Sequence, residues 1–402
     1  MTETPAPIYL DHHATTPCDP RVVEAMVPCF GEVFGNAASG QHAFGRAAAV
    51  KVETARGEVA ALLGCLPSEI VFTSGATEAD NLAIKGVADA YAGRGHHLVT
   101  CATEHRAVLD SCARLERRGF EVTYLGVDED GRVDPAALEA AIRDDTVLVS
   151  LMLANNEIGV VHPIAEVSQV CRGRGVLLHC DAAQGLAYLD CRVDVLGVDL
   201  LSISGHKIYG PKGVGALYAR RRGPRVRLVP RMDGGGHERG RRSGTLDVPG
   251  IVGLGRACAL VADGRIAEAE DVRRLRDLLL ERLKARLPDL EVHGSLVHRL
   301  PNNLNLSIPG VEATDLLERL DTVAASSGAA CSSASADGSY VLKALPGSGD
   351  AVDRGSLRLG LGRFTTQSEV ERAAEEIAAA AVSCRLTPKP PIADACGVTT
   401  CP

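Results

Sequence analysis

The chain of 402 residues is long enough for two or three domains, since one domain usually takes about 100–200 residues. Its composition is typical of a globular protein with a sizeable core, because 46% of the residues are hydrophobic and 23% are charged. The formal net charge of −8 and the aromatic content of 3% argue against a direct nucleic-acid binder, which usually has a basic face or aromatic rings that stack on bases. No apolar run is long enough to span a membrane and residues 1–7 lack the pattern of a secretory signal, so we expect a cytoplasmic protein.

Short apolar runs alternate with helical patterns over residues 69–220. The runs cover residues 69–73, 98–101, 122–125, 147–152, 176–180, 200–203 and 214–218. Runs without polar alternation are typical of strands that are covered on both faces, and their alternation with helices indicates right-handed crossovers. We therefore predict an α/β fold with a mainly parallel sheet, in which ligands bind beyond the carboxyl ends of the strands.

The last third of the chain has a different pattern. A long helix is predicted from near Ile266 to Pro288, because apolar residues recur there at intervals of three and four. A last helix is predicted over residues 367–383, and the proline-rich stretch after Arg385 indicates a flexible tail. The predicted domains are a large domain, residues 15–260, a small α+β domain, residues 1–14 and 261–385, and the tail, residues 386–402.

Cysteines and histidines give no sign of a metal site. The 13 cysteines are scattered without the spacing of a disulfide framework, so we expect mostly free thiols. The histidines at 12–13, 96–97 and 162 have no partners at metal-ligand spacing, and we expect them at the surface or just behind a functional site. Cys396 and Cys401 in the tail could relay sulfur, form a disulfide or be incidental thiols, and as a pair they are too few for a structural zinc site.

A glycine-containing turn, residues 73–78, joins the first apolar run to a helix. The N-terminus of a helix offers unpaired N–H groups and the positive end of a dipole, which suits a phosphate group. The alternative is an ordinary helix cap by Ser74 or Thr77. The turn is not a P-loop, because no Gly-Lys-Ser/Thr follows it.

An acid and a lysine follow two later runs. Asp181 could hold the protonated ring nitrogen of pyridoxal 5'-phosphate (PLP), although a helix cap or a salt bridge is the ordinary use of such a residue. Lys207 follows the run at 200–203, and a lysine that is buried there is costly unless its pKa falls or it reacts, for instance as a Schiff base. An isolated lysine is more often a surface residue of a loop. A phosphate-type turn, then an acid, then a lysine, each after a strand, is the order that a PLP site needs.

Several motifs closely resemble the cysteine desulfurases, which belong to class V of the PLP-dependent aminotransferase (type I) fold. The matching segments are residues 9–11 with 14–17, 72–78, 103–105, 155–159, 202–213, 242–245, 327–332 and 357–366. They occur in order over residues 8–383. The resemblance implies a large domain with a mainly parallel sheet and a smaller α+β C-terminal domain.

The resemblance also implies where PLP binds. Lys207 should hold the cofactor covalently, Asp181 should face the pyridine nitrogen, and His105 should lie over the ring and move protons. Gln184 should bind the ring hydroxyl, with Asn155 close to it. The phosphate should be held by Ala76, Thr77, Ser204 and His206, together with Thr245 of the other subunit of a homodimer.

The same resemblance assigns the substrate and its sulfur. Arg358 should pair with the carboxylate of L-cysteine, next to Asn155, although Gly360 stands where the family commonly has Ser. Cys331, in a stretch of small polar residues that is typical of a mobile loop, should attack the substrate sulfur as a thiolate and keep it as a persulfide. Inert packing is the common alternative for a lone cysteine. The longer loop resembles that of the desulfurases that pass sulfur to acceptor proteins, such as a scaffold or a sulfur carrier.

Other functions stay open at this stage. A selenocysteine lyase or another class V lyase would have the same PLP site, and a plain aminotransferase or a sulfur-carrier platform with little turnover of its own are further alternatives. The acceptor could serve iron–sulfur assembly, tRNA thiolation, DNA phosphorothioation or another biosynthetic pathway. Neither the acceptor, the preference for cysteine over selenocysteine, nor the turnover rate follows from the sequence.

Overall fold

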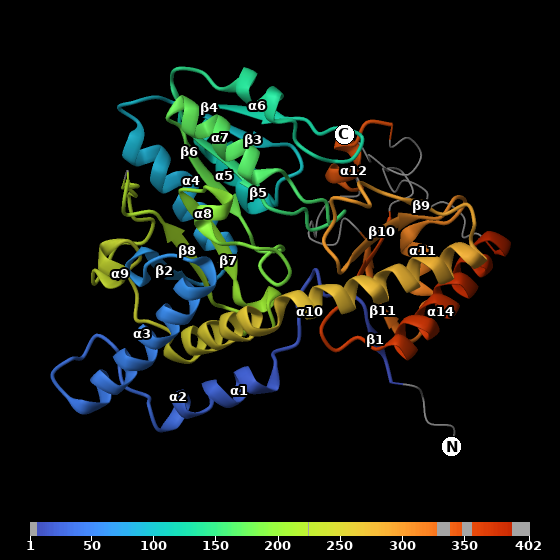
Figure 1. Cartoon of the computed structure of the whole chain (residues 1–402), viewed down its shortest axis with the longest axis horizontal. Helices are drawn as coiled ribbons and strands as arrows, with labels where there is room; N and C mark the ends of the chain where they lie inside the picture. Colours follow the sequence, from blue (N-terminus) through green and yellow to red (C-terminus); the bar gives the residue numbers. More distant parts are fainter. Residues whose placement is uncertain (1–5, 224, 328–337, 348–355, 388–402) are drawn as a thin grey trace, which may run out of the picture.

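The computed structural model of the chain describes residues 6–223, 225–327, 338–347 and 356–387 (Figure 1). Cys331, Cys396, Cys401 and most of the predicted tail lie outside these residues. Among the helices of the described part, none is both long enough and apolar enough to cross a membrane.

A seven-stranded sheet forms the centre of the larger part of the molecule. Its strands, in spatial order, are β2 (Ile70–Thr73), β8 (Gly215–Ala219), β7 (Leu200–Ser204), β6 (Leu177–Asp181), β5 (Thr146–Met152), β3 (His97–Cys101) and β4 (Glu121–Leu125). The five strands from β7 to β4 are parallel, whereas β8 runs antiparallel to both of its neighbours. Each predicted apolar run is thus a strand, and the predicted mainly parallel sheet is confirmed.

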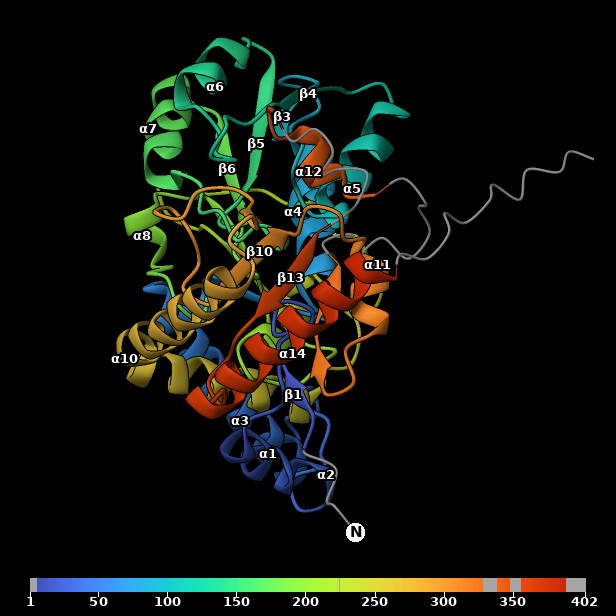
Figure 2. The same ribbon diagram turned by 90° about the vertical axis from the view of Figure 1, so that its right-hand side faces the viewer.

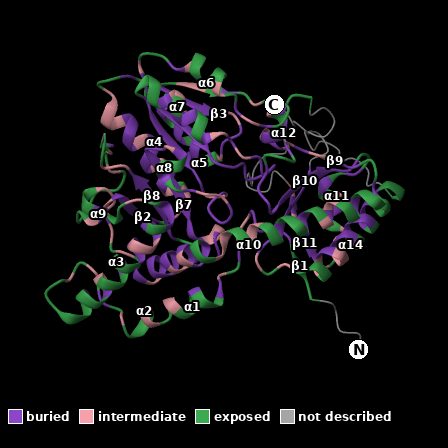
Figure 3. Ribbon diagram, in the orientation of Figure 1, coloured by how far each residue is buried: buried purple, intermediate pink, exposed green. Residues whose placement is uncertain are grey.

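Helices cover both faces of this sheet, which explains why its central strands are buried throughout (Figures 1 and 3). One face packs on α4 (Ala76–Tyr91) and α5 (Arg106–Glu116); the other packs on α3 (Ala43–Leu63), α6 (Pro135–Ala141), α7 (Ile164–Arg174) and α8 (Val193–Leu196). Successive strand residues point to opposite faces of the sheet. Val71 therefore packs in the apolar core on the side of α4 and α5, and its neighbour Phe72 packs in the core on the side of α3. Apolar residues therefore predominate along these strands, and buried polar exceptions such as His179 and Ser202 are hydrogen-bonded to each other.

A smaller four-stranded antiparallel sheet lies beside the first one (Figure 2). Its order is β12 (Ser326–Ser327), β13 (Leu357–Gly360), β10 (Asn303–Ser307) and β9 (Glu291–Val292). The strand β1 (Ile8–Tyr9) pairs in parallel with β11 (Val323–Ala324), so the N-terminus packs with the C-terminal part of the chain. The division into a large and a small domain, with the limits given above, stays a prediction.

The helix α10 (Val248–Arg286) runs from the large sheet to the small one and packs on α14 (Gln367–Leu386) (Figure 1). The predicted start near Ile266 was wrong, because the sequence before it is rich in glycine, which disfavours helices. The structure explains one of these glycines: a Cβ on Gly255 would lie 2.6 Å from the Cα of Ala55 in α3. Close packing of the two helices therefore requires glycine there. The remaining helices are α1 (Pro20–Met26), α2 (Pro28–Gly31), η1 (Pro67–Glu69), η2 (Gly205–Lys207), α9 (His237–Gly240), α11 (Ala313–Glu318) and α12 (Tyr340–Ala344).

Candidate active site

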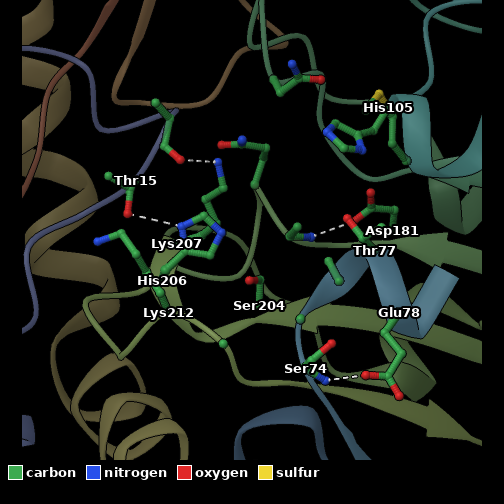
Figure 4. A pocket seen from close by; sticks show the side chains of 18 of the residues that line it. Thr15, Ser74, Thr77, Glu78, His105, Asp181, Ser204, His206, Lys207 and Lys212 are labelled. Atoms are coloured by element: carbon green, nitrogen blue, oxygen red, sulfur yellow. Dashed lines mark hydrogen bonds between the residues drawn. The ribbon is translucent and has the colours of Figure 1, made fainter. Parts of the chain in front are cut away.

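A cavity of about 520 Å³ lies beyond the carboxyl ends of β6 and β7, where α4 begins (Figure 4). Eight of the predicted site residues line it: Ala76, Thr77, His105, Asp181, Gln184, Ser204, His206 and Lys207. The structure thus brings together residues that are far apart in the sequence. Asn155, Thr245 and Arg358 are not among its lining residues, and Cys331 lies outside the described residues.

The N-terminus of α4 forms one end of the cavity. The alternative of a cap by Ser74 or Thr77 does not hold: the N-cap is Gly75, and within the described part of the chain no side chain caps this helix. The φ of Gly75 is 152°, a conformation that L side chains rarely adopt, which explains the glycine. The first N–H groups of α4 are therefore available to an anion in the cavity, as the phosphate interpretation requires.

Two charged groups support this turn from behind. Glu78 accepts a hydrogen bond from the backbone N–H of Ser74 at 2.7 Å and pairs with Arg242 at 2.8 Å. Burial opposes the ionisation of Glu78, but the hydrogen bonds from Arg242 and Ser74 outweigh it and lower its pKa. Arg242 thereby neutralises an acidic side chain that would otherwise repel a phosphate.

His206 and Thr15 form the wall of the cavity next to Ser204. The Nδ1 of His206 lies 3.1 Å from the Thr15 hydroxyl. Burial and the neighbouring Lys207 and Lys212 lower the pKa of His206 to about 4, so its ring is neutral at pH 7. Positive charge on this wall comes from the two lysines.

Asp181 ends β6 and is buried in the opposite part of the cavity, next to His105 (Figure 4). It accepts a hydrogen bond from the backbone N–H of Ala183 at 2.9 Å. Burial raises its pKa, while His105, the Ala183 N–H and Lys207 act in the opposite direction. A protonated ring nitrogen facing Asp181 would stabilise the carboxylate in the same way.

Two further buried carboxyl groups, Asp80 and Glu104, were missed in the sequence. Burial raises the pKa of both well above the ordinary values, and the charge of Asp181 adds to this rise. Burial therefore disfavours the charged form of both groups, and among the three only Asp181 has His105 and Lys207 acting to lower its pKa. Their position in the sequence gave no signal, because Asp80 lies within the predicted helix and Glu104 lies beside His105.

Lys207 ends the short helix η2 directly after β7. Its Nζ donates hydrogen bonds to the backbone carbonyls of Ala14, at 2.9 Å, and His13. The N-terminal segment, which packs with the small sheet, therefore helps to place this amine in the large cavity.

His105 is the N-cap of α5. Its Nδ1 accepts the backbone N–H of Ala107 at 3.1 Å. Burial lowers its pKa, Asp181 opposes this shift, and Lys207 adds to it. The positive end of the helix dipole also disfavours a cation here. The ring is therefore neutral, and its proton lies on Nε2, because Nδ1 is used as an acceptor.

The asparagine that faces the cavity is Asn156 and not Asn155. The side chain of Asn155 is taken up by the backbone: it donates to Thr103 O at 2.8 Å and accepts from the N–H groups of Glu157 and Ile158. Asn156 lines the cavity, and its buried Oδ1 has no hydrogen-bond partner among the described residues. Asn156, and not Asn155, is therefore the residue that could lie near the ring hydroxyl of PLP. The turn after β5 points the two side chains in different directions.

Arg358 is fully buried behind Asn156. Its guanidinium donates to Asp11 Oδ1 at 3.0 Å, to the Ser326 hydroxyl at 2.8 Å and to Asn156 O at 3.1 Å, while its Nε has no partner among the described residues. It therefore supports the cavity wall in this conformation and already pairs with one carboxylate. Ser326 directly precedes the segment that contains Cys331.

Two lining residues, Thr15 and Lys212, were not chosen from the sequence although both lie within matching motifs. Of the histidines expected at the surface or just behind the site, His96 is exposed, and His13 is buried in contact with the lining residue Gln184, whereas His12, His97 and His162 are buried. Within the described ranges, no group of three or more His, Cys, Asp or Glu residues could hold a metal ion.

Comparisons with known proteins agree with this geometry. Residues 8–373 match the family of class-V aminotransferases. A protein from Anaeromyxobacter sp. (strain Fw109-5), named cysteine desulfurase IscS, is 60% identical over 365 residues, which are 91% of this chain and 90% of that protein. The chain belongs to the cysteine desulfurase family.

Solved structures show the same relationship. A NifS-like protein has a TM-score of 0.86 and 36% identity, and the match covers 93% of this chain and 98% of that one. A structure titled SspA in complex with cysteine has a TM-score of 0.78 and 35% identity, covering 89% of this chain and 100% of that one. These matches confirm the predicted fold class.

The donor set of this cysteine desulfurase fits PLP, the cofactor of the family. The uncapped N-terminus of α4 suits the phosphate, and the buried Asp181 suits the ring nitrogen. Lys207 provides the amine between them, and the unpartnered Asn156 Oδ1 is a polar group that a ligand would satisfy. The residues present therefore account for each polar part of the cofactor.

Proposed function

We propose that this chain converts L-cysteine to L-alanine with PLP at Lys207, and that it keeps the sulfur as a persulfide on Cys331 for delivery to an acceptor protein. The observation that supports this most is the convergence of Lys207, Asp181, His105 and the N-terminus of α4 on one cavity. The acceptor that we propose is a scaffold protein of iron–sulfur cluster assembly or a sulfur carrier for thiolation. Relatives that are 53–60% identical carry the name cysteine desulfurase IscS, which favours this activity over a selenocysteine lyase.

When bound, PLP provides an aldehyde that reacts with amines and a ring that takes up electrons from the adjacent carbon. Lys207 would hold its aldehyde carbon, and Asp181 would keep its ring nitrogen protonated. Ala76, Thr77, Ser204 and His206 would bind its phosphate, and Gln184 and Asn156 would face its ring substituents.

Lys207 and His105 move the protons. With its amine free, Lys207 would take the Cα proton of the substrate at Nζ, and the carbonyls of Ala14 and His13 would stabilise the resulting ammonium. His105 would take up the proton of the substrate thiol at its unprotonated nitrogen and pass a proton on to the product, which returns the ring to its neutral state. Because its pKa is lowered, the ring is neutral at pH 7 and can accept the proton in the first step.

Cys331 receives the sulfur. As a thiolate it forms an S–S bond to the substrate sulfur while the substrate C–S bond breaks, and the electron pair of that bond stays with the carbon skeleton. The carbon takes up a proton and leaves as alanine. A thiol or an acceptor protein then removes the outer sulfur from Cys331.

Arg358 is the group that we propose for the substrate carboxylate. Its guanidinium already pairs with Asp11 at 3.0 Å, and its Nε lacks a partner among the described residues. A planar guanidinium binds carboxylates in a bidentate manner, so the substrate could replace Asp11 on it.

A homodimer completes the proposed site. Large apolar side chains are exposed on α1, α2 and α3 and in the segment between α2 and α3, among them Phe30 at 69%, Phe34 at 63% and Phe44 at 57%. Exposed apolar groups of this size mark interaction surfaces. We propose that a second copy of this chain covers them and that Thr245, which is exposed here, reaches the phosphate site of the partner.

The test is release of alanine and sulfide from L-cysteine in the presence of a thiol reductant, with the absorbance near 400 nm recorded in parallel. The wild type should be yellow and form both products. Cys331→Ala should stay yellow but form no sulfide, and Lys207→Ala should lose the yellow colour and the activity. A Cys331→Ala variant as active as the wild type would exclude the persulfide. A protein that stays colourless after PLP is added would exclude Lys207 as the cofactor site.

A further inference from the structure

The imidazole of His13 is buried and has no role in the proposed reaction, although it contacts the cavity-lining residue Gln184. Its side chain is 1% exposed, and burial together with the nearby Arg358 lowers its pKa to about 3, so the ring is neutral. Its Nδ1 lies 3.1 Å from Gln184 Oε1 and its Nε2 lies 3.1 Å from Asn303 Nδ2. Because a neutral imidazole has a single N–H, one of these nitrogens donates and the other accepts.

Arg299 determines which nitrogen accepts. A guanidinium can only donate, and Arg299 Nη1 donates to Asn303 Oδ1 at 2.7 Å. The amide nitrogen of Asn303 must then be the group that faces His13, and it also donates to Glu157 O at 3.1 Å. An amide nitrogen cannot accept, so His13 Nε2 is the acceptor and the ring proton lies on Nδ1.

Gln184 leads to the same assignment from the other end. Its Nε2 donates to the backbone carbonyl of His13 at 3.1 Å, and a carbonyl can only accept. Gln184 Oε1 therefore faces His13 Nδ1 and accepts its proton. The two independent ends of the chain of hydrogen bonds agree.

We propose that His13, protonated on Nδ1, is a positioning residue that holds Gln184 with its amide N–H directed at the ring oxygen of PLP. The inference rests on the proposed function and deepens it. Since Oε1 is occupied by His13, Gln184 faces the cavity as a donor, and a donor stabilises negative charge on a ring oxygen. Gly360 leaves room for this arrangement, because a Cβ there would lie 2.8 Å from His13 Cδ2.

The first test measures the tautomer directly. The full chain, labelled with 15N-histidine and loaded with PLP, is studied by NMR from about pH 6 to about pH 9, and the His13 signals are assigned by their loss in His13→Asn. We expect a protonated Nδ1 and an unprotonated Nε2 that do not change over this range. A proton on Nε2, or a titration within this range, would overturn the inference. The same spectrum of the cofactor-free chain gives this answer even if the proposed function is wrong.

The second test separates positioning from mere stability. In His13→Phe both side-chain hydrogen bonds are lost, whereas His162→Phe removes a buried histidine that does not line the cavity. We expect His13→Phe to raise the pKa of the yellow chromophore by about one unit, the effect of losing one hydrogen bond to a charged oxygen, and His162→Phe to leave it unchanged. An unchanged chromophore pKa in His13→Phe would overturn the inference.

A third variant covers the case in which His13→Phe does not fold. Asn303→Asp replaces the donor that faces His13 Nε2 with an acceptor, so that nitrogen should become protonated in the NMR spectrum. An Nε2 that stays unprotonated in this variant would also overturn the inference.

Discussion

Glu157 offers a sharp test of the electrostatics of this molecule. Its side chain is buried, and it accepts a hydrogen bond from the hydroxyl of Ser339, the N-cap of α12, at 2.5 Å. Burial raises its pKa from 4.5 to about 7, although Ser339 and Arg358 act in the opposite direction. Ser339 follows closely after the segment that contains Cys331, so this contact holds the chain at a position near that segment.

The effect on stability has a definite sign. Because the folded state holds a proton at Glu157 that the unfolded chain releases near pH 4.5, the free energy of unfolding falls as the pH rises from about 4.5 to about 7 and is constant above. A pKa shift from 4.5 to about 7 changes the free energy of unfolding by about 3 kcal/mol, and about 2.5 kcal/mol of this change occurs between about pH 5 and about pH 8. Glu157→Gln has no carboxyl group to titrate, so its free energy of unfolding should not fall in this way.

The assay is urea unfolding of the PLP-loaded protein at a fixed protein concentration, at about pH 5 and at about pH 8. At each pH, the free energy of unfolding of the wild type is subtracted from that of Glu157→Gln. This difference should be about 2.5 kcal/mol larger at the higher pH than at the lower one. Glu166→Gln, on the exposed side of α7, is the matched control and should follow the wild type. If Glu157→Gln has the same pH dependence as the wild type, the carboxyl group is not protonated at neutral pH and the reasoning is wrong.

Four further substitutions test the packing and the site. In α10, Gly255→Ala should destabilise the fold by about 1–3 kcal/mol because its Cβ would meet Ala55, whereas Gly264→Ala, which faces open space, should stabilise it by about 0.5–1 kcal/mol; thermal unfolding that gives both changes the same sign would contradict this. His105→Asn can still cap α5 but cannot move a proton, so kcat should fall by about 10²-fold or more while the absorbance near 400 nm persists; an unchanged kcat would exclude the proton-transfer role. Asp181→Asn should also lower kcat by about 10²-fold or more, because the ring nitrogen loses its anionic partner, and a variant with full activity would show that the carboxylate is not needed.

The sequence by itself determined the layers of the fold and the order of the site. Strands that are buried on both faces need an unbroken apolar run, and the seven runs are visible without any structure. Parallel strands end at a common edge, so Asp181 after β6 and Lys207 after β7 could be expected to meet. The family motifs also pointed to Cys331, which lies outside the described residues.

Only the tertiary structure decided which way individual side chains point. Asn155 and Asn156 are identical in type and adjacent, and the backbone of the turn after β5 sends only Asn156 to the cavity. The early start of α10 depends on contact with α3, which compensates for the low helix propensity of glycine. The proton on His13 Nδ1 follows from a chain of hydrogen bonds that begins at Arg299, far away in the sequence. Such features depend on contacts between distant segments, and a local sequence pattern contains no information about them.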